Sequence, residues 1–265
     1  MSVAEAERGG QDGAWVESHR DEDLTFCLQV FRDLALGAAC LTRLRRAYPG
    51  AAVVLVSDGD DDPRWADLAA RHAARYVRGQ RLYAVERGGA IVQRLLDLYL
   101  ERPTPWLLRI DTDTRVHRRF RRLPAGACVF GTLERRTFTH GEALAPPVVQ
   151  GGCIGFTRDA AERLHRLGVF RSPALADWAA TWADTADARE RASGGRVSFD
   201  HLVRWGCREA GVQARAHDEV FCVWRGRVRN PGLRYAVTHP HKPWWQLPRL
   251  WASVWLSRRV PPRPR

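Results

Sequence analysis

Short apolar runs alternate with longer segments of helical periodicity along most of this chain. The runs are bounded by Gly, Pro or Asp, which is the pattern of buried strands. Strands are expected at residues 24–31, 51–56, 76–77, 106–113, 127–133, 148–156, 212–223 and 235–238. Helices are expected at residues 34–48, 63–76, 90–100, 157–167 and 201–210, with the glycine pair Gly88-Gly89 opening the third of them. This alternation predicts an α/β fold with a mostly parallel central sheet flanked by helices.

The composition changes at both ends of the chain, so we expect one domain at residues 24–245. Residues 1–23 are polar and acidic, with no apolar core of a secretory signal, and we expect a disordered tail there. Residues 246–265 are rich in Trp, Arg and Pro, and their apolar side chains share one helical face. Such a helix either packs on the domain or anchors the protein at a membrane surface, where Trp and Arg both suit the headgroup layer.

The overall composition excludes several classes of protein. With 265 residues, 45% of them hydrophobic and 27% charged, the chain is typical of a globular protein, and no run approaches the about 20 apolar residues of a membrane span. The formal net charge is +12, but the arginines are scattered and Lys242 is the only lysine. This favours an anionic small substrate or a membrane surface over nucleic acid. The six cysteines form no Cys-x-x-Cys pair, which indicates that they are reduced core thiols. We therefore expect a cytoplasmic protein, either free or in peripheral contact with a membrane.

Two aspartates separated by one residue, Asp111 and Asp113, end the apolar run that starts at Trp106. Carboxylates this close repel each other unless a cation or a proton lies between them. A divalent ion such as Mg²⁺ or Mn²⁺ with a bound phosphate would meet that need. A solvated turn after a strand is the alternative, and the pair alone does not decide between them.

Three other positions carry candidate chemistry. Asp58 directly follows the strand at 51–56, whereas the aspartates at 60–62 lie further out in a turn that also starts a helix. Gly151 and Gly152 interrupt the strand at 148–156, which indicates either a bulge or a close approach of backbone to a ligand. Asp200 precedes a helix and is either its N-cap or a functional acid.

Two histidines, His239 and His241, follow the last predicted strand with a proline between them. Neutral imidazole binds Mn²⁺ and similar ions, so the pair could supply a metal ligand. Two surface histidines in a loop are the alternative interpretation.

Taken in order, these residues resemble the GT-A fold glycosyltransferases, which transfer a sugar from a nucleotide-diphosphate donor. Asp111-Thr112-Asp113 looks like the Asp-x-Asp metal motif, and Gly151-Gly152 looks like the glycine loop of the acceptor side. Ser198-Phe199-Asp200 is similar to the acidic motif at a helix start, and His239 to the C-terminal metal histidine. The resemblance spans roughly residues 24–244. It implies a single GT-A (Rossmann-like) domain, a nucleotide-diphosphate sugar, a hydroxyl acceptor, and Mn²⁺ or Mg²⁺.

The resemblance also implies a role for each residue. The metal ligands would be Asp111, Asp113 and His239, with His241 as an alternative to the last. The donor would be bound by Asp58, Arg94, Asp111, Gly151, Gly152 and Lys242. Asp58 would accept a hydrogen bond from the nucleobase, and Arg94 or Lys242 would place positive charge near the phosphates.

Two subgroups of the family share features with this chain. Asp200, before a helix that ends at Gly211, is similar to the acid of inverting family 2 enzymes. In that case Asp200 would be the general base, and we expect an inverting reaction. His239 with Lys242-Pro243-Trp244 looks like a shortened His…Lys-Pro-Trp motif of retaining family 8. Arg94 looks like the helix arginine of the same family. Phe199 departs from the pattern, because a second carboxylate is common there.

Other classes of protein fit the chain less well. A sugar nucleotidyltransferase of related fold would need a glycine-rich basic loop after the first strand, which is absent. A haloacid dehalogenase-like phosphatase would use Asp111 as nucleophile, but it needs a late acidic pair, and no acidic residue follows Glu219. A noncatalytic module that binds membrane or RNA through its basic surface is the third alternative.

Overall fold

The computed structural model describes residues 14–60, 62–80, 82, 84–134, 147–175, 199–222 and 234–239. Three predictions lie outside this part of the chain: the donor-binding role of Lys242, the metal-binding role of His241, and the C-terminal helix or membrane anchor at 246–265. Within the described residues, no helix is both long enough and apolar enough to cross a membrane.

Seven strands form the central sheet in the order β10-β8-β9-β5-β2-β3-β4. Their bounds are β2 Leu24–Val30, β3 Ala52–Ser57, β4 Arg75–Val77, β5 Trp106–Asp111, β8 Cys128–Glu134, β9 Val148–Thr157 and β10 Gln213–Ala216. Neighbouring strands are parallel except around β9, which runs antiparallel to both β5 and β8. The predicted mostly parallel α/β sheet is therefore confirmed.

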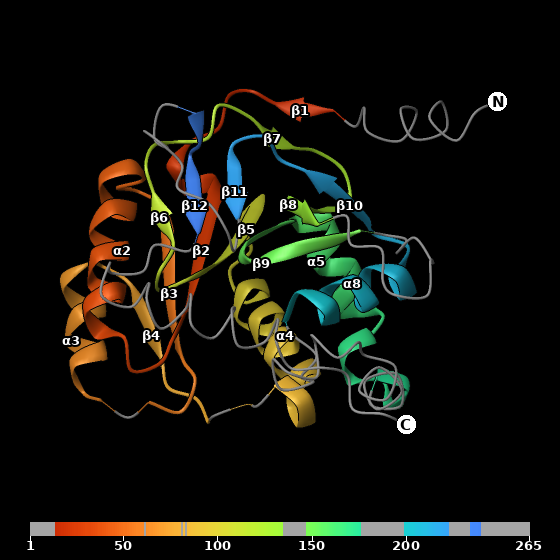
Figure 1. Cartoon of the computed structure of the whole chain (residues 1–265), viewed down its shortest axis with the longest axis horizontal. Helices are drawn as coiled ribbons and strands as arrows, with labels where there is room; N and C mark the ends of the chain where they lie inside the picture. Colours follow the sequence, from red (N-terminus) through yellow and green to blue (C-terminus); the bar gives the residue numbers. More distant parts are fainter. Residues whose placement is uncertain are drawn as a thin grey trace, which may run out of the picture.

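Helices cover both faces of this sheet (Figure 1). One face carries α2 (Leu34–Ala47) and α3 (Arg64–Arg71), and the other carries α4 (Ala84–Leu100), α5 (Arg158–Arg166) and α8 (Phe199–Ala210). Alternate residues of β2 serve the two cores, because successive strand side chains point to opposite faces. Phe26 and Leu28 pack with α2 and α3, whereas Cys27 packs with α4. Two short 3-10 helices lie at Asp21–Asp23 and Val169–Arg171.

Several predicted boundaries are wrong, among them the end of the helix predicted at 63–76, because α3 ends at Arg71 and β4 begins at Arg75. Helix α4 begins at Ala84, so the glycine pair at 88–89 lies inside it. Gly89 faces the backbone of Phe170 with no room for a Cβ atom, so it is a packing position instead of a helix start. The strand predicted at 212–223 is two strands, β10 and β11 (Val220–Cys222), because the intervening turn moves the chain from the central sheet to another.

That other sheet has three short strands in the order β11-β12-β6, with β12 at Val237–His239 and β6 at Arg115–Val116. Strand β12 is parallel to β11 and antiparallel to β6, and Thr238 lies opposite Arg115. Because β6 follows the Asp111-Thr112-Asp113 turn within two residues, this pairing brings His239 next to the two aspartates.

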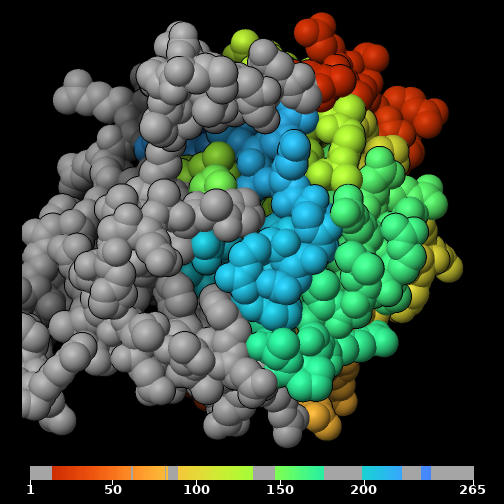
Figure 2. Space-filling model, turned by 90° about the vertical axis from the view of Figure 1, so that its right-hand side faces the viewer, coloured from red at the N-terminus to blue at the C-terminus, as the bar shows by residue number. Residues whose placement is uncertain are grey.

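The N-terminal segment belongs to the domain from residue 14 onward. Strand β1 (Trp15–Val16) pairs with β7 (Leu123–Pro124), and the two lie together at the surface in Figure 2. The Trp15 ring lies 4.5 Å from the guanidinium carbon of Arg122 and 4.6 Å from that of Arg215. These contacts correct the prediction of a disordered tail up to residue 23, because residues 14–23 pack on the sheet; residues 1–13 are outside the described part.

Candidate metal centre and active site

Asp111, Asp113 and His239 form a compact cluster at the carboxyl end of β5. The Nε2 atom of His239 lies 2.9 Å from Asp113 Oδ1 and 3.4 Å from Asp111 Oδ2. One potential ligand atom from each of the three residues lies within 4.8 Å of the others, so the cluster could hold a metal ion. The Asp113 side chain is 9% exposed and that of Asp111 is 31% exposed, so the cluster opens to solvent on the Asp111 side.

A tight turn aims the two aspartates at the same point. The amide of Thr114 donates to the carbonyl of Asp111 at 3.0 Å, and the Thr114 hydroxyl accepts from the Asp111 amide at 3.1 Å. The same hydroxyl donates to the carbonyl of Gly152 at 2.8 Å, which fastens the turn to β9. Thr114 therefore has a part in the site that sequence reasoning did not assign.

The glycine pair lies in a bulge of β9, which is one of the two interpretations that the sequence left open. Gly131 of β8 pairs with Ile154 of β9, and Leu133, two residues further along β8, pairs with Val149. More residues of β9 than of β8 lie between these two pairings, so β9 bulges at the glycine pair. At Gly152 the backbone also approaches another group closely, because the His239 ring occupies the space that a Cβ atom would need. The glycine thus makes room for a cluster residue.

Asp200 lies on the other side of this glycine pair. A Cβ atom placed on Gly151 would lie 3.7 Å from the Asp200 carboxyl carbon, so the carboxyl group is next to the bulge. Asp200 has helical conformation in the first turn of α8, so it is not the N-cap of the helix as described. The acid and the His239 imidazole therefore flank two consecutive residues of one strand.

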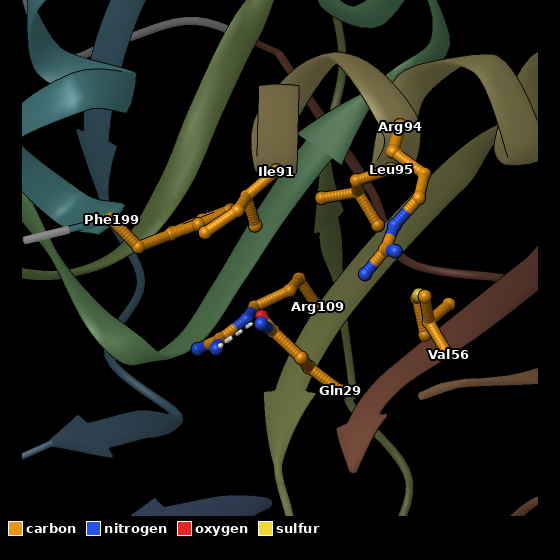
Figure 3. A pocket seen from close by; sticks show the side chains of 8 residues that line it. Gln29, Val56, Ile91, Arg94, Leu95, Arg109 and Phe199 are labelled. Carbon is orange, nitrogen blue, oxygen red and sulfur yellow. Dashed lines mark hydrogen bonds between the residues drawn. The ribbon is translucent and has the colours of Figure 1, made fainter. Parts of the chain in front are cut away.

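Arg109, in the middle of β5, contacts several of these groups and was not among the predicted site residues. Its Nη2 atom lies 2.6 Å from Asp111 Oδ1 and donates to Gln29 Oε1 at 3.2 Å, and its Nη1 atom donates to the carbonyl of Gly151. Figure 3 shows its guanidinium group next to Gln29 and directed toward Phe199. The available signal in the sequence was a single charged residue inside the apolar run at 106–110.

Asp58 and Arg94 lie near the carboxyl end of β3. Asp58 Oδ1 accepts a hydrogen bond from the Leu82 amide at 2.9 Å. Arg94 donates to the carbonyls of Ser57 at 3.2 Å and Gln80 at 3.4 Å, and burial lowers its pKa below the ordinary value. Arg94 and Arg109 line the same small pocket between the sheet and α4 (Figure 3).

All six cysteines are free and buried, which confirms their interpretation as core residues. Cys40 is nearest the cluster, with its Sγ atom 3.9 Å from the Asp111 carbonyl oxygen. Burial, with a further contribution from Asp111 and Asp113, raises the pKa of its thiol to about 12. Cys40 therefore stays protonated near neutral pH and does not compete as a thiolate ligand.

No protein-family model matches this chain, and no curated protein matches it. Among solved structures, the galactosyltransferase LgtC in complex with donor and acceptor sugar analogues is similar to it, with a TM-score of 0.55 and 13% sequence identity. The match covers 90% of this chain and 98% of LgtC. At this identity the likeness establishes the fold alone. The chain therefore has the GT-A glycosyltransferase fold, an α/β domain around a seven-stranded, mostly parallel sheet.

Proposed function

We propose that this protein is a metal-dependent glycosyltransferase that moves a sugar from a nucleotide-diphosphate sugar to an acceptor hydroxyl. The observation that carries the proposal is the cluster of Asp111, Asp113 and His239 at the carboxyl end of β5. In α/β sheets this edge is where ligands bind. The LgtC structure, which has the same fold, contains donor and acceptor sugar analogues.

The donor atoms of the cluster fit a divalent ion. Two carboxylates provide the oxygen ligands that Mg²⁺ and Mn²⁺ prefer, and the imidazole nitrogen favours Mn²⁺. Because His239 Nε2 already lies 2.9 Å from one carboxylate and 3.4 Å from the other, the three groups converge without rearrangement of the backbone. A bound ion would supply positive charge that stabilises the leaving nucleotide diphosphate.

The residues around the cluster would bind the rest of the donor. Asp58 accepts one hydrogen bond from Leu82, and a carboxylate has acceptor capacity beyond that bond, so Asp58 can still accept from a nucleobase. Arg94 would add fixed positive charge at the carboxyl end of β3. Lys242, and His241 as an alternative ligand, enter the proposal through the sequence resemblance alone.

Asp200 would be the general base of an inverting reaction. Its carboxyl group lies beside Gly151, across the glycine pair from His239, so an acceptor on that side would face the sugar opposite the metal. A carboxylate there would take the proton from the acceptor hydroxyl as the hydroxyl oxygen attacks the anomeric carbon. In the retaining alternative, Asp200 would contact the sugar or the acceptor without removing this proton in a single displacement.

The experiment that tests the proposal is a thermal-shift screen of UDP, GDP, CDP and dTDP sugars, each with and without Mn²⁺. We expect one nucleotide to stabilise the protein only when Mn²⁺ is present. Asp113→Ala should abolish that stabilisation, whereas Asp67→Ala, on the exposed surface of α3, should preserve it. Equal stabilisation with and without Mn²⁺, or a normal response of Asp113→Ala, would refute the metal site.

Product analysis separates transfer from the related nucleotidyltransferase reaction. Transfer or slow hydrolysis of the stabilising nucleotide sugar releases a nucleoside diphosphate. Formation of pyrophosphate from a nucleoside triphosphate and a sugar phosphate would instead assign the protein to the sugar nucleotidyltransferases.

A further inference from the structure

Arg109 is a charged residue at the centre of a buried strand. It is 8% exposed, and its neighbours Leu108 and Ile110 are fully buried. Its Nε atom is buried with no hydrogen-bond partner among the described residues. Because a buried charge with incomplete hydrogen bonding is usually less stabilising than an apolar side chain of the same volume, the stability of the sheet does not explain this residue.

The guanidinium group divides the two oxygens of Asp111 between two tasks. Arg109 Nη2 lies 2.6 Å from Asp111 Oδ1, whereas the other oxygen, Oδ2, lies 3.4 Å from His239 Nε2. With Oδ1 held by the guanidinium group, Oδ2 is the oxygen that lies toward His239. The ion pair therefore selects both the rotamer of Asp111 and the oxygen that it presents.

Arg109 is itself held by groups from three other elements. Gly151 of β9 accepts from Nη1, and Gln29 of β2 accepts from Nη2 at 3.2 Å. The guanidinium carbon lies 4.7 Å from the ring centroid of Phe199, the first described residue of α8 (Figure 3). Because Phe199 precedes Asp200 directly, the start of α8 is connected through one side chain to the metal-binding carboxylate.

We propose that Arg109 is a positioning residue that sets the geometry of Asp111 for metal binding and connects it to the start of α8. The inference rests on the proposed function and assigns a role to a residue of the same site. A lysine cannot replace it, because one ammonium group cannot reproduce the planar fork that contacts Asp111 and Gly151 while it stacks on Phe199.

The sign of one measurement distinguishes positioning from a simple charge effect. A guanidinium group beside a metal-binding carboxylate repels the cation, so its removal would strengthen metal binding if charge alone mattered. If Arg109 orients Asp111, its removal weakens metal binding despite the loss of this repulsion. Residues that orient metal ligands typically contribute about 10-fold to 100-fold in metal affinity.

The test measures binding of Mn²⁺ alone to the full chain, by the loss of the free-ion signal in electron paramagnetic resonance. We expect Arg109→Met to weaken Mn²⁺ binding by about tenfold or more. Arg109→Lys should weaken it as well although the charge is kept, and Phe199→Leu should cause a smaller loss. Arg215→Met is the matched control, because Arg215 is 6% exposed in β10 of the same sheet and lies against Trp15.

Each outcome decides between the alternatives, provided that circular dichroism shows a folded variant. Unchanged or tighter Mn²⁺ binding by Arg109→Met would overturn the positioning role, and Arg109→Lys decides the matter if the methionine variant does not fold. Unchanged binding by Phe199→Leu would overturn the connection to α8. Failure of the unmodified protein to bind Mn²⁺ would refute both the proposed function and this inference. If the unmodified protein and the Arg109 variants bind Mn²⁺ equally well, only the inference is refuted.

Discussion

His239 packs so closely against Gly152 that position 152 has no room for a Cβ atom. Gly152→Ala should therefore displace the imidazole from Asp113 and weaken Mn²⁺ binding by about tenfold or more, as loss of a residue that orients a metal ligand typically does. Calorimetric titration of Mn²⁺ into the variant would measure this loss.

The neighbouring glycine provides the control. A Cβ atom on Gly151 would meet the Asp200 carboxyl carbon at 3.7 Å, an ordinary contact distance. Gly151→Ala should thus retain Mn²⁺ affinity close to that of the unmodified protein. Equal losses in the two variants would mean that the bulge, and not the contact with His239, determines the metal site.

Asp200→Asn should lower turnover by about 100-fold or more, because general-base catalysis typically contributes that much. The amide keeps the size of the side chain but cannot take a proton, so Mn²⁺-dependent binding of the nucleotide should hardly change. Steady-state kinetics with thermal-shift measurements of donor binding would check both parts. Near-normal turnover would remove Asp200 from the chemistry.

The anomeric configuration of the product tests the same assignment independently. A single displacement with Asp200 as base inverts the anomeric centre of the donor sugar. Proton NMR of the product during the first turnovers, before mutarotation or further reaction, should show the opposite anomer to that of the donor. Retention would instead support the family 8-like alternative that Arg94 and His239 suggested.

Asp60 should contribute more to stability than its neighbour Asp62. Asp60 Oδ2 accepts from the Trp65 indole at 2.9 Å and from the Arg32 amide at 2.6 Å, and these hydrogen bonds lower the pKa of Asp60, with the largest effect from Trp65. Because Trp65 is fully buried, Asp60→Ala leaves its N–H unpaired and should reduce the free energy of unfolding by about 1–3 kcal/mol.

Urea unfolding measures this change, and Asp62→Ala is the control. Asp62 forms an ion pair with the exposed Arg64 side chain, which water can replace, so its removal should have little effect. A larger loss in Asp62→Ala than in Asp60→Ala would contradict the role assigned to the indole hydrogen bond.

His217 should make the protein less stable in mild acid. Its side chain is fully buried among aromatic rings, with Nδ1 accepting from the Glu219 amide at 3.2 Å and Nε2 donating to the Arg122 carbonyl at 3.0 Å. Burial lowers the pKa of His217 below the ordinary 6.5 and outweighs the opposing effects of the Arg122 hydrogen bond and nearby carboxylates.

The sign of the effect follows from this direction. As the pH falls below 6.5, the unfolded chain binds a proton at His217 before the folded protein does. The contribution of neutral His217 to the free energy of unfolding is therefore complete above pH 6.5 and is lost as the pH falls toward the lowered pKa of the folded protein. His217→Gln, which can keep an acceptor and a donor without titrating, should reduce the difference in urea midpoint between about pH 7.5 and about pH 5. An unchanged pH dependence would assign the acid sensitivity to other groups.

The sequence by itself determined the alternating order of strands and helices in an α/β fold. The spacing of apolar residues and the positions of turn residues are local properties of the chain, so they can be identified without knowledge of tertiary contacts. The direction of β9 was not readable, since a buried strand has the same apolar pattern whether it runs parallel or antiparallel to its neighbours. The strand at 212–223 was predicted as continuous, although only its second half, β11, is a fully apolar run. The first half, β10, alternates polar residues with alanine, and the two strands belong to different sheets.

The Asp111-Thr112-Asp113 turn was a visible candidate because its residues are adjacent in sequence. Its meeting with His239 depended on the pairing of β12 with β6, which joins residues more than a hundred positions apart and leaves no local signature. The role of Arg109 was even less accessible from the sequence, because a single charged residue in an apolar run indicates only that its side chain requires a partner. Tertiary packing decided that the partners are Asp111, Gly151 and Phe199, since a buried guanidinium group takes whatever acceptors and ring faces the neighbouring strands and helix place within its reach.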